Sequence, residues 1–169
     1  MSRNLLILRH GKSDWSQDCD DFNRPLKKRG RRDTYRVGQW LQQQDFAPQR
    51  ILTSPAVRAR DTAHIIAEVL DADSRVVEDQ RLYGADPETL RSVLADLPDA
   101  VQRVILVGHN PGLEWLGEWL LGRPLPATEA GKRLSTATLA WLAVPTAWDA
   151  LRKGGARLQH FVRPADLAT

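Results

Sequence analysis

The stretch LLILRHGKSDWS, residues 5–16, decides the fold predicted for this chain of 169 residues. Its first four residues are apolar without alternation, which is typical of a strand buried on both faces of a parallel sheet. The apolar run stops at Arg9 and His10, and Gly11 follows them directly. The sequence therefore predicts a central strand that ends in two basic side chains.

Short apolar strands and amphipathic helices alternate along most of the chain, an order typical of a largely parallel sheet covered by helices. Two further apolar stretches near the C-terminus are predicted to extend this sheet at one edge. We expect a three-layer α/β/α domain with a mostly parallel central sheet of about six strands. Strands are predicted at residues 5–9, 50–53, 75–78, 104–108, 136–144 and 156–162, and helices at residues 30–44, 56–70, behind residue 86 and at 112–121.

The composition indicates a single domain spanning residues 1–169, because the chain is long enough for one substantial core and short for two. The single cysteine, Cys19, cannot form an intramolecular disulfide, so a reducing cytoplasmic setting is expected. The apolar run at residues 5–8 is far shorter than a signal peptide or a membrane span requires. We expect a cytoplasmic protein without a membrane partner.

The charge is mildly basic, with a formal net charge of +3, and basic residues cluster in KKRGRR, residues 27–32. Such a cluster could be a nucleic-acid patch or the solvated start of a helix. It is short, lacks interleaved aromatic residues and runs into a helical pattern, which favours the solvated helix start. No nucleic-acid partner is therefore expected.

Basic residues follow two predicted strands and begin one predicted helix. Arg9 and His10 end the first strand, His109 follows the strand at residues 104–108, and Arg58 lies near the start of the helix at residues 56–70. Ligands of open α/β sheets bind beyond the carboxyl ends of the strands, so these side chains are predicted to share one rim. The N-terminus of a helix also favours an anion.

This set of residues matches the needs of phosphoryl transfer. Arginines can bind phosphate oxygens in a bidentate manner, and a neutral imidazole can attack phosphorus to form a phosphohistidine. A second imidazole, as a cation, can neutralise the transferring oxygens, and no metal or other cofactor is required. Taken singly, His10 and His109 could equally be structural histidines at strand ends, and Arg58 a surface residue; the convergence of all four favours a site.

Three segments resemble the motifs of the histidine phosphatase superfamily, the phosphoglycerate-mutase-like enzymes. They are RHGKSDW from residue 9, TSPAVRARDTA from residue 53 and VGHNPGLE from residue 107. The resemblance implies that His10 is the phosphorylated nucleophile, that Arg9 and Arg58 bind phosphate, and that His109 completes the pocket. Gly11 and Asn110 are also expected to bind substrate, with Gly11 allowing a close approach of the backbone to a ligand.

Within this superfamily, the chain most resembles the short bacterial phosphohistidine phosphatases of the SixA type. It is small, it carries NRPLKKRG at residues 23–30 after the first motif, and it lacks a large insertion between residues 70 and 86. Larger members use such an insertion to enclose small phosphorylated metabolites. The resemblance therefore implies an open pocket that accepts a phosphorylated side chain of another protein.

Two positions depart from the mutase-like pattern. Ser16 stands where those members have an asparagine, and its hydroxyl is the corresponding candidate for a phosphate contact. Leu82 is followed by Tyr83 where those members have a carboxylate proton donor, and the nearest downstream carboxylate is Asp86. Asp86 is either that proton donor or, because Pro87 follows it, the N-cap of a helix; Ser54 ahead of Pro55 is likewise expected to be an N-cap.

A missing general acid favours a phosphoramidate substrate, because an imidazole can leave already protonated whereas an alkoxide needs a proton. The first interpretation is thus a phosphatase that removes phosphate from phosphohistidine on a protein. A small-molecule phosphomonoesterase of the same fold is the second. The third is a phosphoprotein-binding module without turnover, which the presence of all four pocket residues disfavours.

Overall fold

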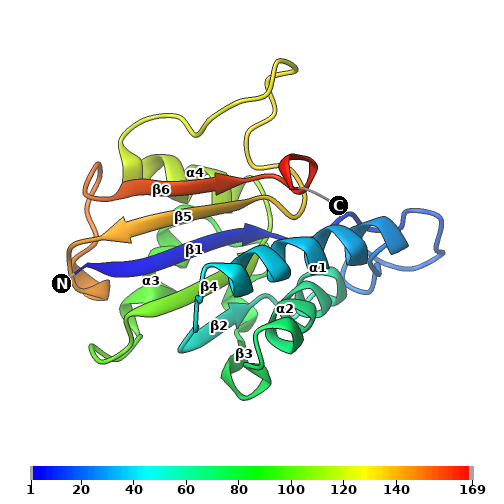
Figure 1. Ribbon diagram of the computed structural model, residues 1–169, viewed down its shortest axis with the longest axis horizontal. Coiled ribbons are helices and arrows are strands. Elements are labelled where there is room, and N and C mark those ends of the chain that lie inside the picture. Colours follow the sequence, from blue (N-terminus) through cyan, green and yellow to red (C-terminus); the bar gives the residue numbers. More distant parts are fainter. Residues whose placement is uncertain (1, 168–169) are drawn as a thin grey trace.

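The computed structural model describes residues 2–167, and a single sheet of six strands runs through it in the order β3-β2-β4-β1-β5-β6 (Figure 1). The four strands β3, β2, β4 and β1 are parallel, whereas β5 runs antiparallel to β1 and to β6. The strands are β1 (Arg3–Arg9), β2 (Arg50–Thr53), β3 (Val76–Glu78), β4 (Arg103–Gly108), β5 (Leu139–Val144) and β6 (Arg157–Val162).

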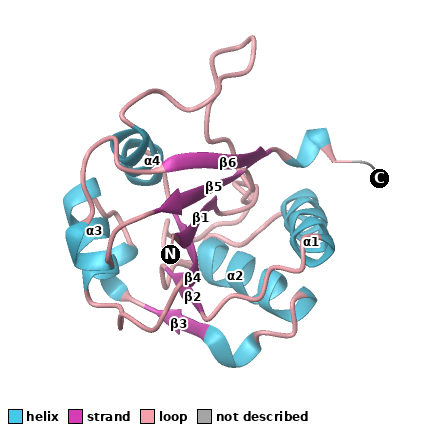
Figure 2. Ribbon diagram, turned by 60° about the vertical axis from the view of Figure 1, so that its left-hand side comes forward, coloured by secondary structure: helices cyan, strands magenta, loops and turns pink. Residues whose placement is uncertain are grey.

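Two helices cover each face of this sheet, which Figure 2 shows nearly edge-on. Helices α1 and α2 pack on one face, and α3 and α4 pack on the other. The predicted three-layer α/β fold is therefore confirmed. The helices are α1 (Lys28–Gln43), α2 (Val57–Val69), α3 (Pro87–Ala95) and α4 (Gly112–Leu121).

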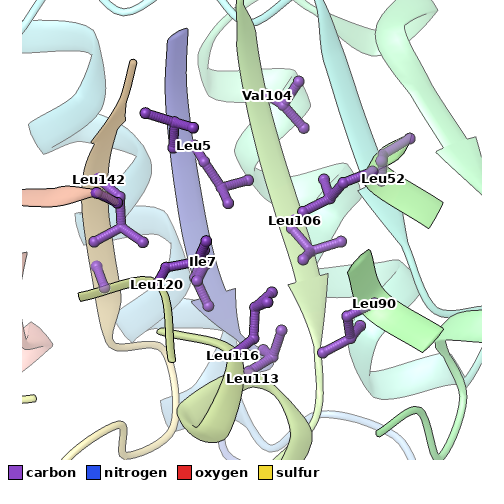
Figure 3. Packing of buried hydrophobic residues seen from close by; sticks show 14 of the residues in the cluster. Leu5, Ile7, Leu52, Leu90, Val104, Leu106, Leu113, Leu116, Leu120 and Leu142 are labelled. Atoms are coloured by element: carbon purple, nitrogen blue, oxygen red, sulfur yellow. The ribbon is translucent and has the colours of Figure 1, made fainter. Parts of the chain in front are cut away.

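Strand β1 supplies both cores because its side chains alternate between the two faces. Leu5 and Ile7 point towards α3 and α4, where Figure 3 shows them among the leucines of those helices. Leu6 and Leu8 pack against α1 and α2 instead. All four are fully buried, which explains why the strand reads as an uninterrupted apolar run.

The first two helices do not begin at the predicted residues. Helix α1 begins at Lys28, so the basic cluster forms its exposed first turns as expected. Helix α2 begins at Val57 without a side-chain cap, and the expectation that Ser54 is its N-cap is wrong. The Ser54 hydroxyl accepts a hydrogen bond from the N–H of Ala56 and is also hydrogen-bonded to the ring of His109.

The connection from α4 to β5 includes residues 124–134. It extends away from the sheet in both ribbon views, and its far end returns to the carboxyl end of β1 (Figures 1 and 2). There the carbonyl of Leu134 accepts hydrogen bonds from Arg9 and Asn110. No helix within residues 2–167 is long and apolar enough to cross a membrane.

Candidate active site

The parallel register of β1 and β4 brings the two histidines together. Arg9 lies beside Gly108, so the next residue of each strand, His10 and His109, leaves the sheet at the same place. The N–H of His10 still donates to the carbonyl of Gly108 at 3.1 Å. The two imidazole rings lie with their centroids 5.3 Å apart, as two adjacent strand ends require.

A backbone carbonyl holds the His10 ring. Nδ1 of His10 lies 2.7 Å from the oxygen of Gly11, a distance at which Nδ1 must carry the proton and donate it. Nε2 is then the unprotonated nitrogen of the neutral ring. His10 is 6% exposed, and it is among the residues that line a pocket at this end of the sheet.

The hydroxyl of Ser54 holds the His109 ring from the end of β2. Nε2 of His109 lies 2.8 Å from Ser54 Oγ. Nδ1 of His109 is buried and has no hydrogen-bond partner among the described residues. A buried nitrogen without a hydrogen-bond partner is costly, so the position of this ring has to be explained by more than its own hydrogen bonds.

Both histidines are neutral in the free pocket. Burial lowers the pKa of His10 to about 3. The hydrogen bond to Gly11 opposes this shift, whereas the charges of His109, Arg9 and Arg58 add to it. Burial and the positive charge of Arg58 lower the pKa of His109 to about 4. A pKa of about 4 leaves the His109 imidazole uncharged at neutral pH, so the cation expected of the second imidazole would require an added proton. A bound anion would raise both pKa values.

Two arginines bring positive charge next to these rings. Arg9, the last residue of β1, donates through Nη1 to the carbonyl of Leu134 at 3.3 Å. Arg58, in the first turn of α2, donates through Nη1 and Nη2 to Asp21. Nε of each is buried and without a partner in residues 2–167. Burial, opposed by Glu114, lowers the pKa of Arg9.

A pocket of about 490 Å³ opens beside these groups. Arg9 and His10 line it directly, whereas Arg58 and His109 are not among its lining residues. The connection between α4 and β5 forms the opposite wall. The remaining lining residues are Lys12, Ser13, Trp15, Arg24, Asn110, Glu114, Gly131, Lys132, Arg133, Leu134, Ser135 and Thr136.

Gly11 packs against the neighbouring helices and is not among the residues that line the pocket. A Cβ at this position would lie 2.7 Å from the carbonyl oxygen of Gly30 and 2.8 Å from Thr34 Oγ1, so only glycine fits against α1. Its N–H donates to Thr62 Oγ1 and its carbonyl accepts from His10. The Gly11 backbone thus lies close to α1 and α2, and its close approach to a ligand stays a prediction.

Ser16 and Asn110, both expected to contact substrate, have different surroundings. The Ser16 hydroxyl is exposed and donates to Asp14 at 2.6 Å, and Ser16 is not among the residues that line the described pocket. Asn110 lines the pocket and donates through Nδ2 to the carbonyl of Leu134 at 2.6 Å. Its Oδ1 is buried without a partner in the described part of the chain.

Asp86 caps a helix. Its carboxylate accepts from the N–H of Thr89 at 2.8 Å, which makes it the N-cap of α3, and this contact lowers the pKa of Asp86. The side chain is exposed, and its hydrogen bond satisfies a helix end instead of facing the histidines. The structure therefore gives no support to Asp86 as a proton donor.

Several residues at the site carry no position-specific signal in the sequence. Arg24 lines the pocket, stacks on Trp15 with its guanidinium carbon 3.7 Å from the ring centroid, and donates to Ser13. Glu114 lines the pocket and accepts from the N–H of Leu134. Arg24 belongs to the segment NRPLKKRG, and the position of this arginine between a polar residue and a proline is the signal that could have indicated it. No group of three or more histidine, cysteine or acidic residues within residues 2–167 is placed to hold a metal ion.

Known proteins share both the motifs and the fold. The family model of the histidine phosphatase superfamily (branch 1) matches residues 5–86. An uncharacterised protein of Mycobacterium tuberculosis is 34% identical over 162 residues, which cover 93% of this chain and 99% of that protein. A phosphohistidine phosphatase SixA homolog of Haemophilus influenzae is 28% identical over 117 residues, or 64% of this chain and 71% of the homolog.

A solved structure extends the likeness to the whole domain. The putative phosphohistidine phosphatase SixA from Nakamurella multipartitia superposes with a TM-score of 0.83 at 27% identity, covering 97% of each chain. The similarity therefore includes the C-terminal half of the sheet, beyond the region that the family model matches. With the motifs at the strand ends and relatives that span the chain, this protein belongs to the histidine phosphatase superfamily and is a phosphatase.

Proposed function

We propose that this phosphatase uses His10 as its nucleophile, passes through a phosphohistidine intermediate without a metal, and removes phosphate from phosphohistidine on a protein. The observation that carries the proposal is the 2.7 Å hydrogen bond between His10 Nδ1 and the carbonyl of Gly11. It fixes the tautomer, so that Nε2 offers its lone pair. The lowered pKa of His10 keeps the ring neutral at physiological pH.

The reaction divides into two displacements at phosphorus. Nε2 of His10 attacks, a new N–P bond forms, and the bond from phosphorus to the substrate nitrogen breaks. Water then attacks phosphorus, the N–P bond to His10 breaks, and inorganic phosphate leaves. Arg9 and Arg58 stabilise the charge on the transferring oxygens, and His109 offers its free Nδ1 to the same group.

The preference for phosphohistidine rests on the carboxylates around the pocket. Asp86 is engaged as a helix cap, and the hydrogen bonds of Asp21 hold its pKa well below its usual range, so neither supplies a proton at neutral pH. A phosphorylated imidazole can leave with its proton already on the ring, whereas an alkyl ester cannot. The relatives named phosphohistidine phosphatases support the same substrate class.

A substrate panel tests this proposal. Phosphohistidine in a carrier protein, a sugar phosphate and an aryl phosphate are compared at equal concentration, with His10→Ala as the blank. We expect the phosphohistidine to be hydrolysed fastest and the blank to be inactive. Hydrolysis of the sugar phosphate as fast as the phosphohistidine would instead identify a small-molecule phosphomonoesterase.

Two further measurements sharpen the result. Rapid quenching with labelled substrate should trap label on the wild-type protein and none on His10→Ala; tight binding without trapped label or turnover would identify a binding module. Glu114 is a carboxylate that lines the pocket, unlike Asp86, and Glu114→Gln removes its charge. If Glu114 were a general acid, this variant would lose ester hydrolysis far more than phosphohistidine hydrolysis.

A further inference from the structure

One carboxylate joins three segments around the site. Asp21 lies in the connection between β1 and α1, and its Oδ1 accepts from Arg24 Nη1 at 2.7 Å. Its Oδ2 accepts from Arg58 Nη2 at 3.1 Å and from the hydroxyl of Tyr83 at 2.6 Å. The first turn of α2 and the segment behind β3 are thereby tied to the nucleophile's own connection.

Arg58 depends on this carboxylate for its counter-charge. Its side chain is 7% exposed and lies close enough to Arg9 to lower the pKa of Arg9. A buried guanidinium beside another cation is costly unless it is paired and hydrogen-bonded. Asp21 provides the pairing, since Oδ2 forms the ion pair and the Asp21 backbone carbonyl accepts from Nη1 at 2.6 Å.

The two hydrogen bonds from Arg58 to Asp21 also determine the orientation of the Arg58 guanidinium. Both terminal nitrogens of Arg58 are engaged by the same residue, which leaves Nε as the buried donor without a partner in residues 2–167. A planar group held at two nitrogens cannot rotate without breaking both hydrogen bonds. The orientation of the Arg58 guanidinium is therefore set by Asp21.

Tyr83 extends the same arrangement to the second histidine. Its hydroxyl is held by Asp21, and its ring packs edge-on against His109 with centroids 5.7 Å apart. Tyr83 occupies the position behind Leu82 where the mutase-like pattern has a carboxylate. In this chain the side chain at that position is a phenol, and its hydroxyl is hydrogen-bonded to Asp21.

We infer that Asp21 is a positioning residue of this phosphatase: by binding both terminal nitrogens of Arg58 and the hydroxyl of Tyr83, it presents Arg58 to the transferring phosphoryl group. The inference rests on the proposed function of the site. A misdirected arginine stabilises the transition state less, so the expected loss is in kcat more than in KM.

The test compares Asp21→Ala with Asp20→Ala. Asp20 is its neighbour in the same connection and carries the same charge, but its carboxylate accepts only from Asn23 among the described residues. We expect kcat to fall about 100-fold in Asp21→Ala, as for a misplaced catalytic group, and to stay within about 2-fold in Asp20→Ala. Asp21→Asn keeps the shape and one acceptor oxygen, so it serves if the alanine variant does not fold.

A double-mutant cycle with Arg58→Ala separates positioning from a general loss of structure. If Asp21 acts through Arg58, adding Asp21→Ala to Arg58→Ala lowers kcat by less than about 3-fold further. A full additional loss in the double variant, or unchanged kcat in both Asp21 variants, would overturn the inference. So would a rise in kcat, which would mean that the carboxylate competes with substrate for Arg58.

The proposed function is tested separately in the same samples. Wild-type protein that never traps label on His10 would contradict the nucleophile assignment. Wild-type protein that traps label, together with an Asp21→Ala variant that traps it equally fast, would contradict only the role of Asp21.

Discussion

The rings of His10 and His109 lie with centroids 5.3 Å apart and planes inclined by 56°, and each ring is held by a different strand end. His10 is held by its own backbone neighbour, whereas His109 depends on the hydroxyl of Ser54 from β2. The first contact cannot be removed by changing a side chain. The contact between His109 and Ser54 can be removed in this way, so a Ser54 variant tests whether activity depends on the orientation of the His109 ring.

We expect Ser54→Ala to lower kcat/KM by about 10- to 100-fold, because the His109 ring loses the contact that orients it. The hydroxyl also accepts from the N–H of Ala56 and is fully buried, so stability should fall by about 1–3 kcal/mol. Steady-state kinetics and urea unfolding measure the two effects. Ser92→Ala, which removes an exposed hydroxyl on α3, is the control; an equal kinetic loss there would contradict the assignment.

The glycine behind the nucleophile allows a second prediction. In Gly11→Ala the added methyl group would lie 2.7 Å from the carbonyl oxygen of Gly30, which is backbone and cannot move aside easily. We expect a loss of about 1–3 kcal/mol in the free energy of unfolding and a lower kcat, since the carbonyl that holds His10 moves as well.

Gly108→Ala is the matched control for this substitution. Its Cβ would meet the side chain of Leu113 at 3.6 Å, which is ordinary van der Waals contact. Thermal unfolding of both variants should therefore rank Gly11→Ala as clearly the less stable. Equal melting temperatures would mean that α1 yields to the methyl group.

The fold was predictable because its signals are local. Buried strands such as residues 104–108 are continuous apolar runs, and Asp86 ahead of Pro87 marks a helix start that the structure confirms. Ser54 ahead of Pro55 is the same type of signal, but it predicts an N-cap wrongly, because the Ser54 hydroxyl is hydrogen-bonded to His109. A sequence pattern cannot distinguish a helix cap from a side chain used across the sheet.

The site was predictable where strand ends determine it and not where long connections do. The register of β1 and β4 makes His10 and His109 neighbours as soon as the sheet is parallel. Asp21 and Tyr83 are 62 positions apart in the chain, and nothing local to either indicates their hydrogen bond. Such contacts depend on how loops fold over the rim, which composition and periodicity do not encode.

The lowered pKa values of the two histidines predict a pH dependence of stability. In the unfolded chain both rings take up a proton near pH 6.5, whereas in the folded protein the pKa values are about 3 and about 4. Between pH 6 and pH 4.5 the unfolded state thus binds more protons, so stability falls as the pH falls. Each histidine contributes a slope of up to about 1.4 kcal/mol per pH unit.

Urea unfolding of His10→Asn from pH 4.5 to 7.5 should show a slope reduced by about half relative to wild type, since His109 still titrates. Identical slopes would mean that His10 is protonated in the folded protein, and the neutral nucleophile would then have to be abandoned.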